Sequence, residues 1–213
     1  MIYSESKNFI FIAIDKTGST SVQALLKPYA HTHQNFKYLR KRLKFAGPLT
    51  RALGIYRHIT FPVHATAGEL KRHFPGAKWD AMFKFCFVRQ PLDRITSRYE
   101  FLRQERRLGE RTSFDEYLNS ILSGKRDFFH QHQYILDKHS SPLVNWWGKL
   151  ESIQTDCDAL AQLLNIPNLS PPPRLNSSKA SGIHYLEYYS YSQIKAAEAF
   201  VSQDMDLFHY PPH

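Results

Sequence analysis

The sequence has few cysteines, and neither stands where a structural cross-link would need it. Its 213 residues contain only two, Cys86 inside an apolar run and Cys157 inside a helical pattern. Two such thiols form neither the disulfide framework of a small secreted domain nor a cluster of metal ligands. We therefore expect two buried thiols in a reducing compartment, and a cytoplasmic protein.

Long hydrophobic runs and internal repeats are also missing. The apolar run at residues 9–14 is far shorter than the roughly 20 residues of a membrane helix, and shorter than a secretory leader requires. No period typical of a solenoid or propeller recurs, and no Gly/Ser-rich linker divides the chain. We predict a single α/β domain over residues 1–213, with no membrane span.

Acidic residues are scarce relative to basic ones. Asp and Glu number 19 against 28 Lys and Arg, which gives a net charge of +9 and favours an anionic partner. Residues 29–58 hold many of the basic side chains. This segment is either a solvated helix with a mobile loop or a basic lip that attracts an acidic acceptor, and the sequence does not separate the two. Charge alone would also suit a non-catalytic module that binds nucleic acid or a sulfated polysaccharide.

The first informative stretch, residues 9–28, has the pattern of a strand, a tight loop and a helix. β-branched and aromatic residues at 9–14 are typical of a buried parallel strand, and the helical spacing begins after the polar loop. Loop N–H groups and a helix N-terminus favour a phosphate or sulfate, Lys16 adds a full charge, and Gly18 lets the backbone approach a ligand. The alternative is an ordinary turn with an incidental cap. The loop also carries the hydroxyl donors Thr17, Ser19, Thr20 and Ser21.

A second stretch repeats this logic. The apolar strand expected at residues 81–88 meets Arg89, whose planar guanidinium suits a phosphate. Pro91 pre-sets the turn and Asp93 can cap the following helix. Ser97 lies in the same helix and reaches the ligand of Arg89 only if the loop folds back over the sheet end. The alternative is a surface network of arginines and an aspartate.

His64 is the candidate general base. Residues 59–63 suggest a short strand that ends at His64, and Thr66 with Glu69 has capping-box spacing for a helix. Open α/β sheets bind ligands at the carboxyl ends of their strands, so this imidazole could accept a proton there. A structural or solvated histidine is the alternative.

Two further helices and one histidine-containing segment can be read from the rest of the sequence. Ser113 and Glu116 form a capping box for a helix to about Leu122, and residues 151–164 carry the apolar stripe of a packed helix. Two histidines at residues 130–133 could be mistaken for a metal site. No cysteine or carboxylate lies at ligand spacing in the sequence, so we expect no metal.

Taken together, residues 16–21 and 88–99, each after a strand, resemble the carbohydrate-type sulfotransferase family. Residues 149–151, 175–178 and 204–210 are similar to its C-terminal half, so the likeness spans nearly the whole chain. The resemblance implies a P-loop-like, three-layer α/β fold with a mostly parallel central sheet flanked by helices. It also suggests that residues 176–179 close over the nucleotide, although an ordinary polar turn is equally consistent with them.

The resemblance further implies the reaction. Such enzymes move a sulfuryl group from 3′-phosphoadenosine 5′-phosphosulfate (PAPS) to an acceptor hydroxyl, need no metal and leave adenosine 3′,5′-bisphosphate (PAP). We expect a carbohydrate acceptor, for which an acidic sugar or glycan is a candidate, and no nucleic-acid partner. Lys16 and His64 would be catalytic. The expected donor-binding residues are Lys16, Thr17, Gly18, Ser19, Thr20 and Ser21 for the phosphosulfate, and Arg89 and Ser97 for the 3′-phosphate.

Two positions depart from the family pattern: Asp15 replaces a proline and Ser19 replaces a glycine. A carboxylate beside the loop would repel the donor, since like charges about 4 Å apart cost roughly 1 kcal/mol in water and more when dry. We therefore predict that Asp15 is paired or turned into the sheet. The runner-up function, a P-loop kinase or NTPase, would require Gly-x-x-x-x-Gly-Lys-Ser/Thr and a magnesium-binding Asp, and neither pattern is present.

Overall fold

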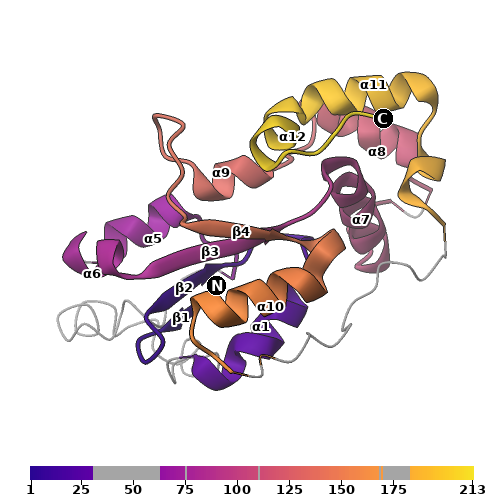
Figure 1. Ribbon diagram of the computed structural model, residues 1–213. Helices are drawn as coiled ribbons and strands as arrows, with labels where there is room; N and C mark the ends of the chain where they lie inside the picture. Colours follow the sequence, from indigo (N-terminus) through magenta and orange to yellow (C-terminus); the bar gives the residue numbers. More distant parts are fainter. Residues whose placement is uncertain (31–62, 75, 110, 168, 170–182) are drawn as a thin grey trace, which may run out of the picture.

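The protein is built around a four-stranded, mostly parallel sheet with the order β1-β2-β3-β4 (Figure 1). β1 pairs with β2 in the antiparallel sense, whereas β2–β3 and β3–β4 are parallel. The α/β class predicted from the sequence is thereby confirmed. The strands are β1 (Ile2–Ser4), β2 (Phe9–Ile12), β3 (Phe83–Val88) and β4 (Trp146–Lys149). The computed structural model describes residues 1–30, 63–74, 76–109, 111–167, 169 and 183–213.

Helices cover both faces of the sheet, as the three-layer prediction requires. Successive strand residues point to opposite faces, so β2 sends Phe9 and Phe11 into one core cluster and Ile10 and Ile12 into another. The phenylalanine face packs against α1 (Ser19–Leu26) and α10 (Ile153–Leu163). The other face packs against α5 (Ala67–His73), α6 (Gly76–Ala81), α9 (Gln131–Ile135) and α12 (Ser202–Phe208).

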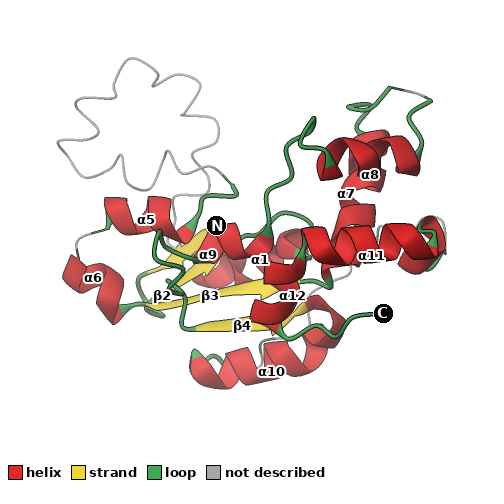
Figure 2. Ribbon diagram, turned by 90° about the horizontal axis from the view of Figure 1, so that it is seen from above, coloured by secondary structure: helices red, strands yellow, loops and turns green. Residues whose placement is uncertain are grey.

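A third core cluster lies beyond the carboxyl ends of the strands. Its centre is the helix that follows β3, and aromatic side chains such as Tyr99, Phe114 and Tyr189 fill it. Figure 2 shows these helices gathered at one end of the sheet. The helices concerned are α7 (Pro91–Gln104), α8 (Phe114–Leu122) and α11 (Tyr191–Phe200), with the 3-10 turn η5 (Tyr185–Tyr188).

Local signals in the sequence placed several elements correctly. Capping boxes form at Thr66 with Glu69 and at Ser113 with Glu116, as predicted. Two strands are shorter than expected, because the last ladder pair of β2 is Ile12 with Cys86 and β3 begins only at Phe83. Two short 3-10 turns, η1 (Lys27–Tyr29) and η3 (Leu150–Ser152), lie beside α1 and α10. Residues 59–62 of the strand expected at 59–63, most of the basic segment and the loop 176–179 fall outside the described residues, and Val63 lies in a turn.

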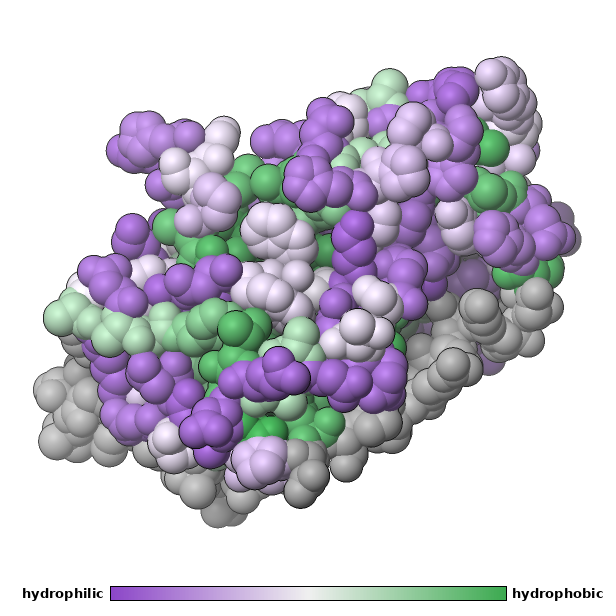
Figure 3. All heavy atoms as spheres, in the orientation of Figure 1, coloured by the Kyte–Doolittle hydropathy of each residue, from purple (hydrophilic) through white to green (hydrophobic). Residues whose placement is uncertain are grey.

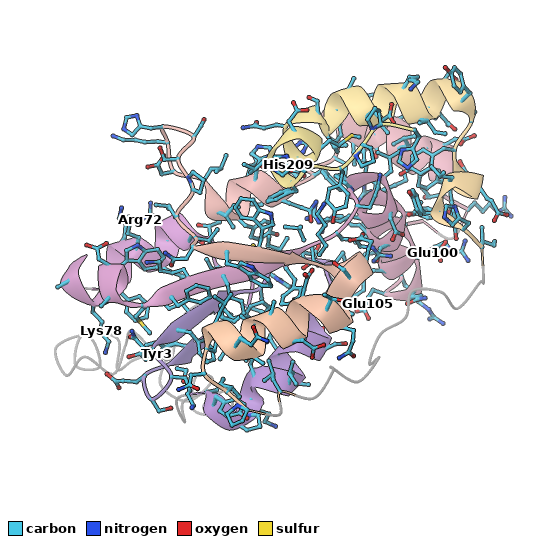
Figure 4. The ribbon with its side chains drawn as sticks, in the orientation of Figure 1. Tyr3, Arg72, Lys78, Glu100, Glu105 and His209 are labelled. Carbon is cyan, nitrogen blue, oxygen red and sulfur yellow. The ribbon has the colours of Figure 1, made fainter. Side chains whose placement is uncertain are left out.

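Both cysteines are buried free thiols, as the sequence predicted. Lys78 forms an ion pair with Glu5 at 2.6 Å and lies 5.2 Å from the ring of Tyr3, which Figure 4 shows at the edge of the sheet. Hydrophilic side chains dominate the face in Figure 3, with hydrophobic areas between them. Among the described residues, no helix combines the length and apolar character needed to cross a bilayer.

The packing of β4 generates the first prediction. A Cβ added to Gly148 would lie 2.6 Å from Cε1 of Phe87 and 2.7 Å from Cη2 of Trp146, inside the core. Gly148→Ala should therefore lower the free energy of unfolding by about 1–3 kcal/mol in urea titrations. Gly76→Ala, whose new Cβ would meet no described atom within 4 Å, should be nearly neutral. Equal losses in both variants would contradict this assignment.

Candidate functional site

The loop between β2 and α1 has an unusual backbone. Lys16 and Gly18 both adopt left-handed conformations, with φ of 64° and 72°. The carbonyl of Gly18 accepts hydrogen bonds from Ser21 N at 3.0 Å and Val22 N at 3.2 Å, and α1 begins at once. Gly18 is required here by its φ and by Leu150, whose Cδ1 would lie 2.6 Å from an added Cβ. The expected strand, tight loop and helix are confirmed.

The loop hydroxyls do not share one role. Thr17 is buried and its hydroxyl donates to the carbonyl of Ile14 at 3.1 Å, so this side chain holds the loop in shape. Ser19 and Ser21 are also buried, whereas Thr20 is exposed. A ligand at this loop would therefore meet Thr17 through its backbone N–H group and not through its side chain.

Asp15 is paired, as predicted. Its carboxylate forms an ion pair with Arg98 of α7, and its carbonyl accepts a hydrogen bond from Nε of Arg94 at 2.8 Å. Arg94 is 1% exposed, and burial lowers the pKa of its guanidinium. Its Nη2 donates to the carbonyl of Phe129 at 2.9 Å. These contacts tie the loop to α7 and to the segment before α9.

Lys16 is half-buried beside α7. Its Nζ lies 4.2 Å from the ring centroid of Phe101, a cation–π contact. Burial lowers the pKa of the Lys16 ammonium; the charge of Asp15 opposes that shift, and the positive charges of Arg89 and Arg98 add to it. The ammonium thus lies in a partly desolvated, positively charged environment that a bound anion would relieve.

Arg89 joins the two loops at the carboxyl ends of β2 and β3. Its Nη1 lies 3.4 Å from the carbonyl oxygen of Lys16, while Nε and Nη2 both donate to Asp93 at 2.8 Å. The structure therefore brings together the two motifs that the sequence analysis connected. Ser97 is buried on α7, 3% exposed, between the arginines that hold Asp15.

His64 lies beside the carboxyl end of β2. Its Nδ1 is 2.7 Å from the carbonyl oxygen of Ala13, two residues before Asp15. A carbonyl only accepts, so Nδ1 carries a proton, and in the neutral imidazole the lone pair is then on Nε2. The ring is exposed. This tautomer is the one that a proton acceptor at Nε2 requires.

The sequence analysis missed three residues that build the candidate site from remote segments, namely Gln131, Glu151 and Asp204. Gln131 brackets the backbone of Arg89, accepting from its N–H at 2.9 Å and donating to its carbonyl at 2.8 Å. Glu151 accepts from the N–H of Gln90 at 2.6 Å and from the hydroxyl of Tyr210 at 2.9 Å. The similarity of residues 149–151 and 204–210 to the family pattern pointed toward the segments of Glu151 and Tyr210. It gave no signal for Gln131.

Asp204 corrects one argument of the sequence analysis. A carboxylate does lie near the two histidines, because α12 brings Asp204 within 4.8 Å of ligand atoms of His130 and His132. Its oxygens, however, already accept from Gln131 N at 2.9 Å, His132 N at 2.8 Å and His132 Nδ1 at 2.7 Å. We therefore assign Asp204 to the N-terminus of α9 as a cap.

The sequence matches a model of a known family, and the fold is similar to that of solved structures. A sequence model of the sulfotransferase family matches residues 1–211. Mouse sulfotransferase SULT7A1, solved in complex with PAP, is 12% identical over 98% of this chain and 91% of that chain, with a TM-score of 0.59. Retinol dehydratase, solved with androsterone and PAP, is 11% identical over 93% and 81%, with a TM-score of 0.49. No curated protein matches the sequence.

The buried Asp204 yields a prediction on pH. Burial opposes its ionisation, but hydrogen bonds from His132 and the α9 backbone outweigh that effect and lower the pKa of Asp204. A folded-state pKa below the unfolded value means that the stabilisation is complete above about pH 4 and is lost as pH falls through the folded-state pKa. Asp204→Asn should cost about 2 kcal/mol at pH 7 and flatten the acid side of the stability curve.

Asp206→Asn is the matched control, since Asp206 is exposed on the same helix. It should leave the free energy of unfolding within about 0.5 kcal/mol of wild type at every pH. If the two variants follow the same pH curve in urea titrations, the capping role of Asp204 is wrong.

Proposed function

The chain belongs to the sulfotransferase family, and from that premise we propose that it moves a sulfuryl group from PAPS to a hydroxyl of a carbohydrate acceptor. The observation that carries the proposal is the meeting of two strand-end loops, with Nη1 of Arg89 3.4 Å from the carbonyl of Lys16. A loop-to-helix anion site and a guanidinium side by side suit a nucleotide that carries two separate phosphate groups. The PAP complex of the mouse enzyme supports the same donor.

The transfer is a displacement at sulfur. The acceptor oxygen attacks the sulfur, the bond from sulfur to the bridging phosphate oxygen breaks, and PAP leaves with the bonding electron pair. Lys16 and the N–H groups at the start of α1 would stabilise the charge that grows on the bridging oxygen and on the sulfuryl oxygens. As in phosphoryl transfer, the protein contributes alignment and charge stabilisation.

His64 is the proposed general base. Its Nδ1 is held by the carbonyl of Ala13 at 2.7 Å, which fixes the ring and leaves Nε2 free to accept the proton of the acceptor hydroxyl. Its place beside the end of β2 supports this role, because Lys16 follows Ala13 by three residues. Asp15 is not available as a base, since Arg98 holds its carboxylate.

Sequence features support the proposed acceptor class and location. The resemblance of the two motifs to carbohydrate-type enzymes supports a sugar, and the net charge of +9 supports an acidic one. Two buried free thiols are consistent with a cytoplasmic location.

Nucleotide choice tests the proposal. PAP at about 100 times its dissociation constant should stabilise the protein by about 2.7 kcal/mol and raise Tm by roughly 5–10 °C. ATP with Mg²⁺ at equal concentration should give a much smaller shift, because it has no 3′-phosphate. A larger shift with ATP and Mg²⁺ would favour the P-loop kinase or NTPase instead. Weak, salt-sensitive shifts with both would favour a basic binding module.

His64→Ala should lower kcat by roughly 10²-fold or more and leave PAP affinity unchanged, because only the proton acceptor is lost. The assay uses labelled PAPS with the best acceptor from a panel of neutral and acidic oligosaccharides. His139→Ala, at an exposed histidine in the turn before β4, is the matched control and should keep wild-type kcat. A His64→Ala enzyme with kcat within about threefold of wild type would exclude His64 as the base.

A further inference from the structure

The backbone of Arg89 lies beyond the end of the sheet. The last ladder pair with β2 is at Cys86 and the last pair with β4 is at Val88, so no strand partners the next residue. Buried backbone N–H and C=O groups need partners. Gln131, which is 0% exposed, supplies both with one side-chain amide, at 2.9 Å and 2.8 Å. Its amide takes the place of a neighbouring strand's peptide group.

Gln131 is itself anchored through its backbone. The N–H of Gln131 donates to Asp204 Oδ2 at 2.9 Å, and Asp204 is 1% exposed on α12. The backbone of Arg89 is therefore fixed by a buried chain of hydrogen bonds that runs from β3 through α9 to α12.

The side chain of Arg89 is held separately. Asp93 accepts from Nε and from Nη2, both at 2.8 Å, and the two side chains are 11% and 26% exposed. A guanidinium has five N–H donors in a planar fork, and this side-on pair uses two of them. Nη1 also donates to the carbonyl of Lys16 at 3.4 Å. Among the described residues, one N–H of Nη1 and one of Nη2 are then left for a ligand. Asp93 is fixed in turn, since its N–H donates to Gln90 Oε1 at 2.9 Å.

We infer that Asp93 and Gln131 are positioning residues for recognition of the 3′-phosphate, holding Arg89 by its side chain and by its backbone so that the end of the guanidinium faces the ligand. Neither residue touches the nucleotide. The inference rests on the proposed function and adds to it the residues that set selectivity between a nucleoside bisphosphate and a monophosphate.

The direction of the change in PAP affinity on replacing Asp93 tests the inference. If charge repulsion dominated, removing the Asp93 carboxylate from beside the anion site would strengthen anion binding. If preorganisation dominates, the same change weakens binding, because a released Arg89 side chain must be ordered each time the phosphate binds. Asp93→Ala should therefore weaken PAP binding.

The experiment is isothermal titration of PAP and of 5′-AMP, which differ by the 3′-phosphate alone. Asp93→Ala and Gln131→Met should each lower the PAP to 5′-AMP affinity ratio roughly tenfold or more, with 5′-AMP affinity within about threefold of wild type. Arg89→Ala gives the loss in the PAP to 5′-AMP affinity ratio when the guanidinium is absent, which is the upper limit for the positioning variants. Asp93→Asn, which keeps the volume and one acceptor oxygen, should fall between Asp93→Ala and wild type and serves if the alanine variant unfolds.

Two matched controls separate positioning from general effects. Glu105→Gln removes an exposed carboxylate from the end of α7 (Figure 4), where its charge acts on Lys16. Gln133→Met removes a surface amide that caps His130 N at 2.7 Å on the same helix as Gln131. Both should keep the wild-type affinity ratio.

Each remaining outcome counts against the inference. A higher PAP affinity in Asp93→Ala would make Asp93 a competitor of the phosphate. An unchanged ratio, or equal losses for both nucleotides, would leave Asp93 and Gln131 as structural residues only. If the wild-type protein itself shows no preference for PAP, the proposed function fails and this inference with it. If wild type prefers PAP and the variants keep that preference, the inference alone fails.

Discussion

The site depends on backbone groups that the sheet leaves without a strand partner. Past the ladder ends of β2 and β3, the chain turns while still buried, and its polar groups must be paired by something other than a strand. Side chains from distant segments do this. In the β2 loop, the carbonyl of Ala13 pairs with His64, that of Asp15 with Arg94 and that of Lys16 with Arg89. After β3, Gln131 pairs with the N–H and carbonyl of Arg89, and Glu151 accepts from the N–H of Gln90.

This pairing explains why the same side chains serve structure and site at once. His64 is oriented by the carbonyl it binds, and Arg89 reaches across from β3 to the β2 loop. Movement of either loop would break these contacts and carry the charged groups with it. A site assembled in this way is preorganised, so less ordering is required when a ligand binds.

The charge balance of the candidate site favours an anionic ligand. Lys16, Arg89, Arg94 and Arg98 contribute positive charge, and Asp15 and Asp93 offset only part of it. Burial lowers the pKa of Lys16 and of Arg94, which indicates that both cations are desolvated at some cost. An anionic ligand would relieve that cost. The carboxylate of Asp15 forms an ion pair with Arg98, so its negative charge is partly offset.

Local patterns in the sequence were sufficient for many of the elements and for the two loops at the strand ends. Hydrophobic periodicity predicted β2, β3 and α10, capping boxes predicted the starts of α5 and α8, and a polar, charged loop was expected after each buried strand. These features follow from neighbouring residues, and local propensity and burial alone produce them. Only the tertiary structure decided that Gln131, Glu151 and Asp204 belong to the site, because each meets its partner across more than 60 positions of chain or from another helix. A hydrogen bond between such residues has no spacing rule, since it exists only once the helices have packed on the sheet.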